Sequence, residues 1–99
     1  MAIVKDIKDI ILDPGGRYYL PAKELANLSE KVMLVRRGEK ILFLTKEEWD
    51  ELEEKELKGL KGAVLRRKRR SLFSSISFEE IHTGNRLHIP SYLLEGGSN

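Results

Sequence analysis

Two stretches of the sequence, 69 positions apart, follow the same order of residue types. They are "LDPGGRYYLPAKEL" (12–25) and "IHTGNRLHIPSYLL" (81–94). Each copy has an apolar residue, a glycine-containing turn, an arginine, a short apolar run and a proline. The positions identical between the copies are Ile7 and Ile76, Gly15 and Gly84, Arg17 and Arg86, Pro21 and Pro90, and Leu25 and Leu94. The repeat predicts a strand–turn–strand unit used twice, whose copies pair because neither can bury its apolar faces alone.

The residues of both turns predict β-hairpins. Asp13 precedes a proline and two glycines, a combination typical of tight turns. We expect a strand from about Ile7 to Leu12 and a returning strand over "RYYL" that ends at Pro21, because proline cannot donate to a ladder. In the second copy, "SSISFEEI" and "RLHI" predict the strands on either side of "HTGNR", and Pro90 ends the second of them.

Two fully apolar runs between the copies predict the centre of the fold. "VMLV" (32–35) and "ILFL" (41–44) flank "RRGEK", whose glycine favours another hairpin. Neither run alternates with polar residues, so both faces of these strands should be covered. We therefore predict a mainly β, α+β fold: a closed swapped-hairpin barrel with one or two flanking helices.

Helix signals follow the second apolar run. Thr45 and Glu48 have the spacing of a capping box, and Leu44 and Trp49 that of a hydrophobic staple. Two glycines, at 59 and 62, should separate this acidic helix from a basic one over about 63–72. The domain division expected is 1–60 for the first unit and 61–99 for the basic helix, a partial second unit and a flexible tail.

The charges are distributed unevenly along the chain. The net charge is +2, but residues 46–56 carry seven acids and two lysines, so the remaining residues carry +7. Such asymmetry suggests one face for a polyanion and another turned away from it. No apolar run is long enough to span a membrane and the first residues do not resemble a signal peptide, so we expect a cytoplasmic protein.

These residues together resemble the MraZ family, within the AbrB-like swapped-hairpin superfamily. Asp13, Gly16 and Arg17 match the family's D-x-x-x-R turn. "LPA" (20–22) matches the proline-containing segment that ends the strand after this turn. "LFLTKEEWDELEEK" (42–55) resembles the family's strand-to-helix junction, and "RRKRRSLFSS" (66–75) its arginine-rich helix. In the second copy, His82 replaces the aspartate and Asn85 a glycine. MraZ-like proteins continue with another hairpin and helix, so we expect an open edge that either is shielded by a partner chain or remains free to pair with other strands.

The resemblance implies a DNA-binding transcriptional regulator that recognises short repeated sites as an oligomer, a dimer or a ring, in the cytoplasm at the nucleoid. The residues expected to contact nucleic acid are Arg17, Arg86, Lys23, Arg36 and Arg37; those expected to organise the turns are Asp13, Gly15, Gly16, His82 and Gly84. Each hairpin arginine either binds phosphate or guanine or forms a salt bridge within its own turn, as Arg17 would with Asp13. Lys23, Arg36 and Arg37 either contact phosphates or are ordinary solvated charges.

Other chemistry has little support in the sequence. "RRKRR" (66–70) points all round a helix, so we expect some of its arginines to pair with the acidic helix, which should lie on the far side from the turns. His82 and His88 match no zinc pattern, and no catalytic constellation or phosphate-binding loop appears. We therefore expect no enzyme, cofactor, metal, small-molecule substrate or membrane partner. The alternative function is a protein-interaction or antitoxin-like module with reduced or lost DNA binding.

Overall fold

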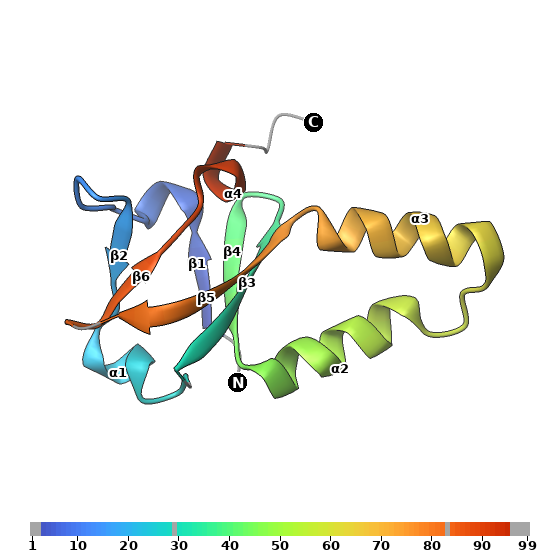
Figure 1. Cartoon of the computed structure of the whole chain (residues 1–99), viewed down its shortest axis with the longest axis horizontal. Helices are drawn as coiled ribbons and strands as arrows, with labels where there is room; N and C mark the ends of the chain where they lie inside the picture. The colour runs from blue at the N-terminus through green and yellow to red at the C-terminus, as the bar shows by residue number, and fades with distance from the viewer. Residues whose placement is uncertain (1–2, 29, 83, 96–99) are drawn as a thin grey trace.

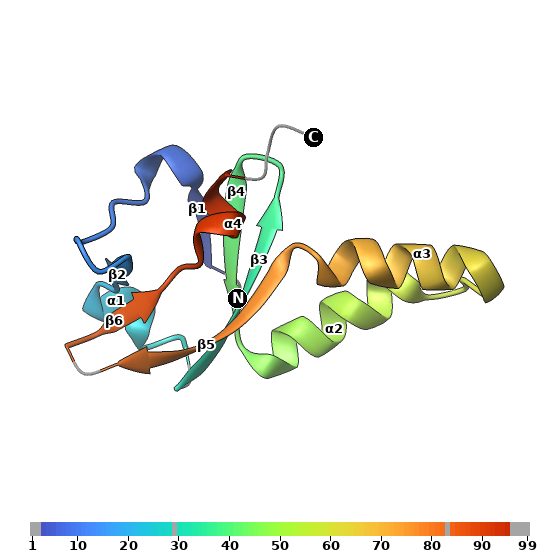
Figure 2. The same cartoon turned by 45° about the horizontal axis from the view of Figure 1, so that its top comes forward.

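The computed structural model describes residues 3–28, 30–82 and 84–95, which form an α+β fold built on one curled antiparallel sheet (Figure 1). The strand order is β1-β4-β3-β5-β6-β2. Figure 2 shows the sheet curling into a half-barrel, while two helices project together from one side of it. The elements in chain order are β1 (Ile3–Asp6), the 3-10 turn η1 (Ile7–Asp9), β2 (Arg17–Tyr19), α1 (Ala22–Leu25), β3 (Lys31–Arg37), β4 (Lys40–Leu44), α2 (Lys46–Leu57), α3 (Gly62–Phe73), β5 (Ile76–His82), β6 (Arg86–His88) and α4 (Ser91–Glu95).

The central strand β3 is covered on both faces, as its uninterrupted apolar run predicts. Val32 and Leu34 belong to the core inside the half-barrel, with Phe43 of β4 and Leu87 of β6. Met33 and Val35 face the other way, into a second cluster with Trp49 and Leu72 of the helices. Because neighbouring residues of a strand point to opposite faces, one run of four apolar residues serves two cores.

The predicted helix signals are confirmed. The Thr45 hydroxyl accepts from the Glu48 N–H at 3.2 Å, and the Glu48 carboxylate accepts from the Thr45 N–H at 2.9 Å. Leu44 and Trp49, the expected staple pair, pack in the same cluster. α2 ends at Leu57, and Gly59, with φ of +79°, takes the chain through a left-handed turn towards α3. The pair α2 and α3 therefore forms a projecting arm.

The predicted strand from Ile7 to Leu12 is wrong. β1 lies earlier, at Ile3–Asp6, and pairs with β4, while the chain turns through η1 and only Leu12 forms a bridge, to Tyr18. In the repeat, residues 7–12 correspond to residues 76–81 of β5, which pairs with β3. In the described part of the chain, no strand pairs with residues 7–12 as β3 pairs with β5, and Ile11 is 81% exposed.

The barrel is curled but its ladder is not closed. β1 and β2 are the two ends of the strand order, so no ladder joins them in the described part of the chain. A side-chain contact crosses the opening instead: Lys5 of β1 forms an ion pair with Glu24 of α1. The hydrogen bond between the Lys5 ammonium group and the Glu24 carboxylate raises the pKa of Lys5. No helix among the described residues is long and apolar enough to cross a membrane.

Candidate nucleic-acid interface

The two hairpins are related by a local twofold axis. In the first, Leu12 bridges Tyr18 and the Asp13 N–H donates to the Arg17 carbonyl. In the second, the residues 69 positions later repeat the register, with Ile81 opposite Leu87 and His82 opposite Arg86. The hairpins have the same internal pairing, so the repeat found in the sequence is a repeat in structure.

The returning strands of the two hairpins pair with each other across this axis. Tyr18 lies opposite Leu87, its own equivalent in the repeat, at the middle of the antiparallel β2–β6 ladder. Two reciprocal hydrogen bonds flank it. The Leu20 N–H donates to the Asn85 carbonyl at 2.8 Å, and the Ile89 N–H donates to the Gly16 carbonyl at 3.3 Å. Each hairpin therefore holds the turn of the other.

The first turn is organised by the Asp13 carboxylate. Its Oδ1 accepts from the N–H groups of Gly15 and Arg17, at 2.9 and 3.0 Å. The Arg17 N–H is the main cause that lowers the pKa of the Asp13 carboxyl below its usual value. Gly16, with φ of +79°, takes the left-handed conformation that favours glycine. The Asp13 carboxylate thus accepts from two backbone N–H groups of its own turn.

The second turn has a different backbone from the first. Gly84 has φ of +82° and Asn85 φ of +60°, so Asn85 takes the left-handed conformation that Gly16 has in the first turn, whereas Gly84 has a positive φ that its equivalent, Gly15, does not have. Asparagine is among the residues that tolerate this conformation. The replacement of glycine by Asn85 therefore keeps a left-handed residue at this position of the turn.

The arginine that pairs with Asp13 belongs to the other hairpin. Arg86 Nη1 donates to Asp13 Oδ2 at 2.8 Å, with both side chains partly exposed. The alternative of a side-chain bridge between Asp13 and Arg17 is wrong, because Arg17 contributes only its backbone N–H. Arg17 itself is exposed at the start of β2, and its guanidinium forms no ion pair with any described residue.

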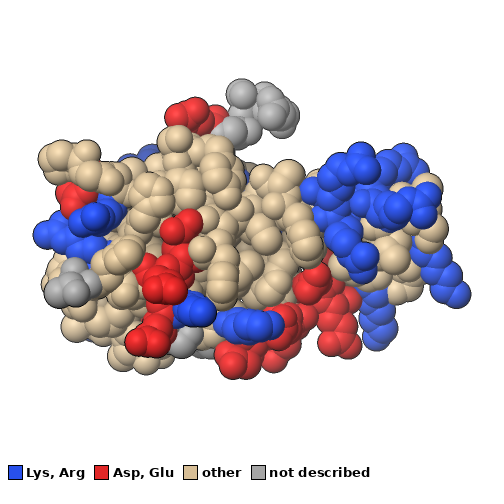
Figure 3. All heavy atoms as spheres, in the orientation of Figure 1, with Lys and Arg blue, Asp and Glu red and all other residues tan. Residues whose placement is uncertain are grey.

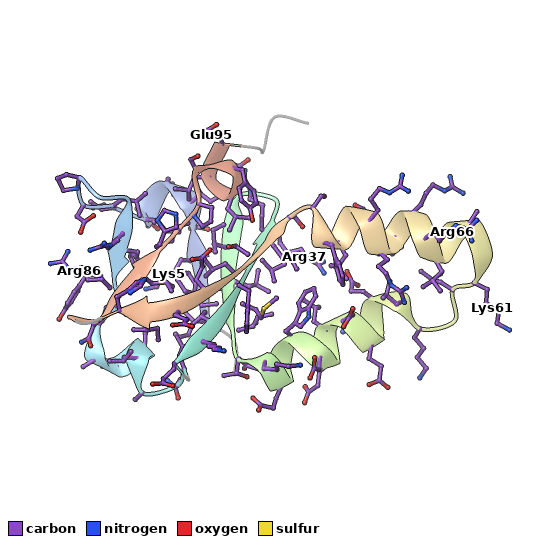
Figure 4. All side chains as sticks on the ribbon, viewed as in Figure 1. Lys5, Arg37, Lys61, Arg66, Arg86 and Glu95 are labelled. Atoms are coloured by element: carbon purple, nitrogen blue, oxygen red, sulfur yellow. The ribbon has the colours of Figure 1, made fainter. Side chains whose placement is uncertain are left out.

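The remaining candidates divide by what their side chains contact. Lys23 lies exposed on α1, beside the hairpins. Arg36 turns inward and donates to the Gly38 and Leu93 carbonyls, at 2.7 and 2.6 Å, which ties the β3–β4 turn to α4. Arg37 forms an ion pair with Glu56 of α2. Figure 4 places Arg37 between the sheet and the arm, away from Arg86 at the hairpin end.

The acidic helix α2 and the basic helix α3 lie in the arm, away from the hairpin turns (Figure 1). Figure 3 shows lysine and arginine side chains gathered over α3 and at the hairpin end, with others along the lower middle, and acidic side chains along α2 and across the middle of the molecule. The acidic helix lies far from the turns, as expected. The expectation that arginines of "RRKRR" pair with α2 is wrong for the described residues, since Lys68 alone reaches an acid, Glu56 at 3.9 Å. The four arginines of this run are exposed.

Comparison with known proteins connects this geometry to a family. No family model matches the chain. The Transcriptional regulator MraZ of Heliobacterium modesticaldum is 36% identical over 87 residues, which cover 85% of this chain and 60% of the relative. This similarity supports membership of the MraZ family. The chain spans about 60% of the length of the curated relative that it matches.

Within the MraZ pattern, this chain keeps one complete turn motif and one altered motif. Asp13 and Arg17 are the family's pair in the first copy, and His82 and Arg86 stand at the matching positions of the second. Sequence reasoning found these four residues but not which of them meet. The pairing follows from the register of β2 on β6, which no single motif encodes. Among the described residues, no cluster of three or more histidine, aspartate or glutamate side chains is arranged to hold a metal ion.

Proposed function

We propose that this chain binds double-stranded DNA through its paired hairpin turns and regulates transcription. The observation that carries the proposal is the exposed, unpaired guanidinium of Arg17 beside the pair Asp13–Arg86, at the end of the molecule opposite the acidic helix. A guanidinium fork suits phosphate oxygens or the O6/N7 edge of guanine. The name of the relative, a transcriptional regulator, supports the same function.

One copy of the chain offers few contacts, so we propose that it acts as an oligomer on repeated sites. Arg17 and Lys23 are the exposed cations at the hairpin end, and Arg36 and Arg37 are held by intramolecular partners. Two or three phosphate contacts give weak binding at physiological salt. Several copies on successive DNA repeats gain affinity through effective concentration without new contacts.

The proposal is tested by titrating a labelled direct-repeat duplex with the protein at several salt concentrations. Arg17→Ala should weaken binding about tenfold and reduce the salt slope by about one, without changing the melting temperature. Lys55→Ala, which removes an exposed charge of α2, is the matched control and should bind like the wild type. Wild-type protein that fails to shift any duplex contradicts the proposal.

A second candidate, a protein-interaction module, is favoured by the exposed apolar residues near the sheet opening. Ile11 is 81% exposed and Val4 of β1 is 50% exposed. Exposed apolar side chains at such positions are candidate contact sites for other proteins. The two functions differ in salt dependence, because binding through Ile11 should survive at salt concentrations that abolish DNA binding. Light scattering of wild type and Ile11→Glu shows whether this region joins copies of the chain.

A further inference from the structure

We infer that the two hairpins do different work: Arg17 contacts the nucleic acid, Arg86 is a positioning residue, and His82 creates the difference. This inference rests on the proposed DNA binding. It begins from the local twofold axis, which requires that every contact made by one hairpin have an equivalent made by the other. The β2–β6 ladder obeys this rule, as its register and the reciprocal hydrogen bonds of Leu20 and Ile89 show. The charged side chains do not.

The broken contact can be identified by applying the axis to the observed ion pair. Arg86 of the second hairpin meets Asp13 of the first at 2.8 Å. The same operation relates Arg86 to Arg17 and Asp13 to His82. A symmetric molecule would therefore pair Arg17 with a carboxylate at position 82. The chain has a histidine there, which offers no negative charge when neutral.

No carboxylate of the described residues forms an ion pair with Arg17. Across the β2–β6 ladder it lies opposite His88, and its own turn uses Asp13 Oδ1 for backbone N–H groups. Among the described residues, its guanidinium has no ion pair, while that of Arg86 is held by Asp13 Oδ2. Two arginines at equivalent positions of the repeat thus differ in their surroundings. The Arg17 guanidinium has no ion pair with a described residue, whereas the Arg86 guanidinium is oriented and its charge is balanced by Asp13.

The difference has a consequence for the DNA that the chain recognises. A symmetric pair of forks would read the same base or phosphate pattern in both directions from the axis. Because the Arg17 guanidinium is available and the Arg86 guanidinium is paired with Asp13, the strongest contact with DNA falls on one side of the axis only. The preferred site of a single chain is therefore asymmetric, with its more stringent half under Arg17, because unpaired guanidinium donors are available for a bidentate contact there.

The inference is tested with four variants, a pool of short random-sequence duplexes and thermal unfolding. Arg17→Ala should lower duplex affinity about tenfold and leave the melting temperature unchanged, whereas Arg86→Ala should lower the melting temperature and change affinity about twofold or less. His82→Asp should place a carboxylate against Arg17, which raises the melting temperature and lowers the affinity. His82→Asn, which adds no charge, is the control and should do neither.

A double variant tests the inferred contact between positions 82 and 17 through protein stability alone, without DNA. The rise in melting temperature caused by His82→Asp should disappear when it is combined with Arg17→Ala, because the new carboxylate then has no partner. A rise that persists overturns the inferred geometry. Equal losses of affinity in Arg17→Ala and Arg86→Ala, with duplex binding intact in the wild type, overturn the division of roles alone. Absence of any duplex binding by the wild type overturns the proposed function and this inference with it.

Discussion

At the scale of single residues, Asp13 connects three parts of the interface through one carboxylate. It accepts from the Gly15 and Arg17 N–H groups of its own turn and from Arg86 of the other hairpin. Every one of these bonds requires an ionised acceptor or is strengthened by one. The charge of Asp13 therefore fixes both the shape of the first turn and the position of the second hairpin's arginine.

The titration of Asp13 should appear in the pH dependence of stability. Its pKa is lowered in the folded chain, chiefly by the Arg17 N–H. A lowered folded pKa gives stability that is fully present above the unfolded value of about 3.9 and is lost as the pH falls through the folded pKa. Asp13→Asn should therefore lower the melting temperature at pH 7, and the difference from wild type should shrink below about pH 4. A difference that stays constant with pH contradicts this role.

The residues of the site were predictable where one turn determines them. Asp before Pro and Gly predicts the turn, and the glycine–asparagine substitution at Asn85 stays within turn chemistry. The meeting of Asp13 with Arg86 was not predictable, because these residues are 73 positions apart and come together only through the pairing of β2 with β6. The inward direction of Arg36 depends on the carbonyl of Leu93 in α4 and has no local signal either.

At the scale of elements, the capping box of α2 determines where the arm leaves the barrel. Both reciprocal bonds between Thr45 and Glu48 are present at the first turn. Thr45→Ala should lower the free energy of unfolding by about 1 kcal/mol, because it removes the acceptor for an N–H at the helix start. Urea unfolding followed by Trp49 fluorescence measures the loss. Thr45→Ser retains the hydroxyl and should recover most of it; an equal loss in both variants would instead indicate a packing role for the threonine methyl.

The elements that sequence reasoning placed well are those whose signals are local. The β3–β4 hairpin, α2 and α3 have turn, capping and periodic signals within their own residues. The segment from Ile7 to Leu12 has the composition of a strand but no strand beside it on its outer side, and strand formation requires a neighbour. The short α4 was not predicted, since five residues after Pro90 give no helical period and its Leu93 is held by burial in the core.

At the scale of the whole molecule, the charged helices are separated from the hairpin turns, but the strands from the two halves of the sequence are paired with each other. The acidic and basic helices lie together in the arm at one end, and the hairpin turns lie at the other (Figure 1, Figure 3). The sheet, by contrast, places the two strands of the second half between strands of the first: β5 pairs with β3, and β6 with β2. A division of the chain near residue 60, expected from the repeat, cuts across this pairing.

Interlocked halves should unfold as one unit, and the single tryptophan provides a test. Trp49 lies in the first half, whereas Leu87 lies in the second and is fully buried beside Leu34 and Phe43. Leu87→Ala removes buried methyl groups and should lower the free energy of unfolding by about 3 kcal/mol, as should Leu34→Ala. If the halves form one cooperative structure, the denaturation midpoint reported by Trp49 fluorescence moves equally in both variants and coincides with that from circular dichroism.

Val64→Ala is the control for a change in the second half outside this core. Val64 is 52% exposed on α3, so its truncation should change stability by less than about 0.5 kcal/mol. A Trp49 transition that ignores Leu87→Ala while circular dichroism shows an early loss of strand signal would mean that the two copies fold separately. The local twofold axis argues against that outcome, because the bonds of Leu20 and Ile89 join each hairpin to the turn of the other.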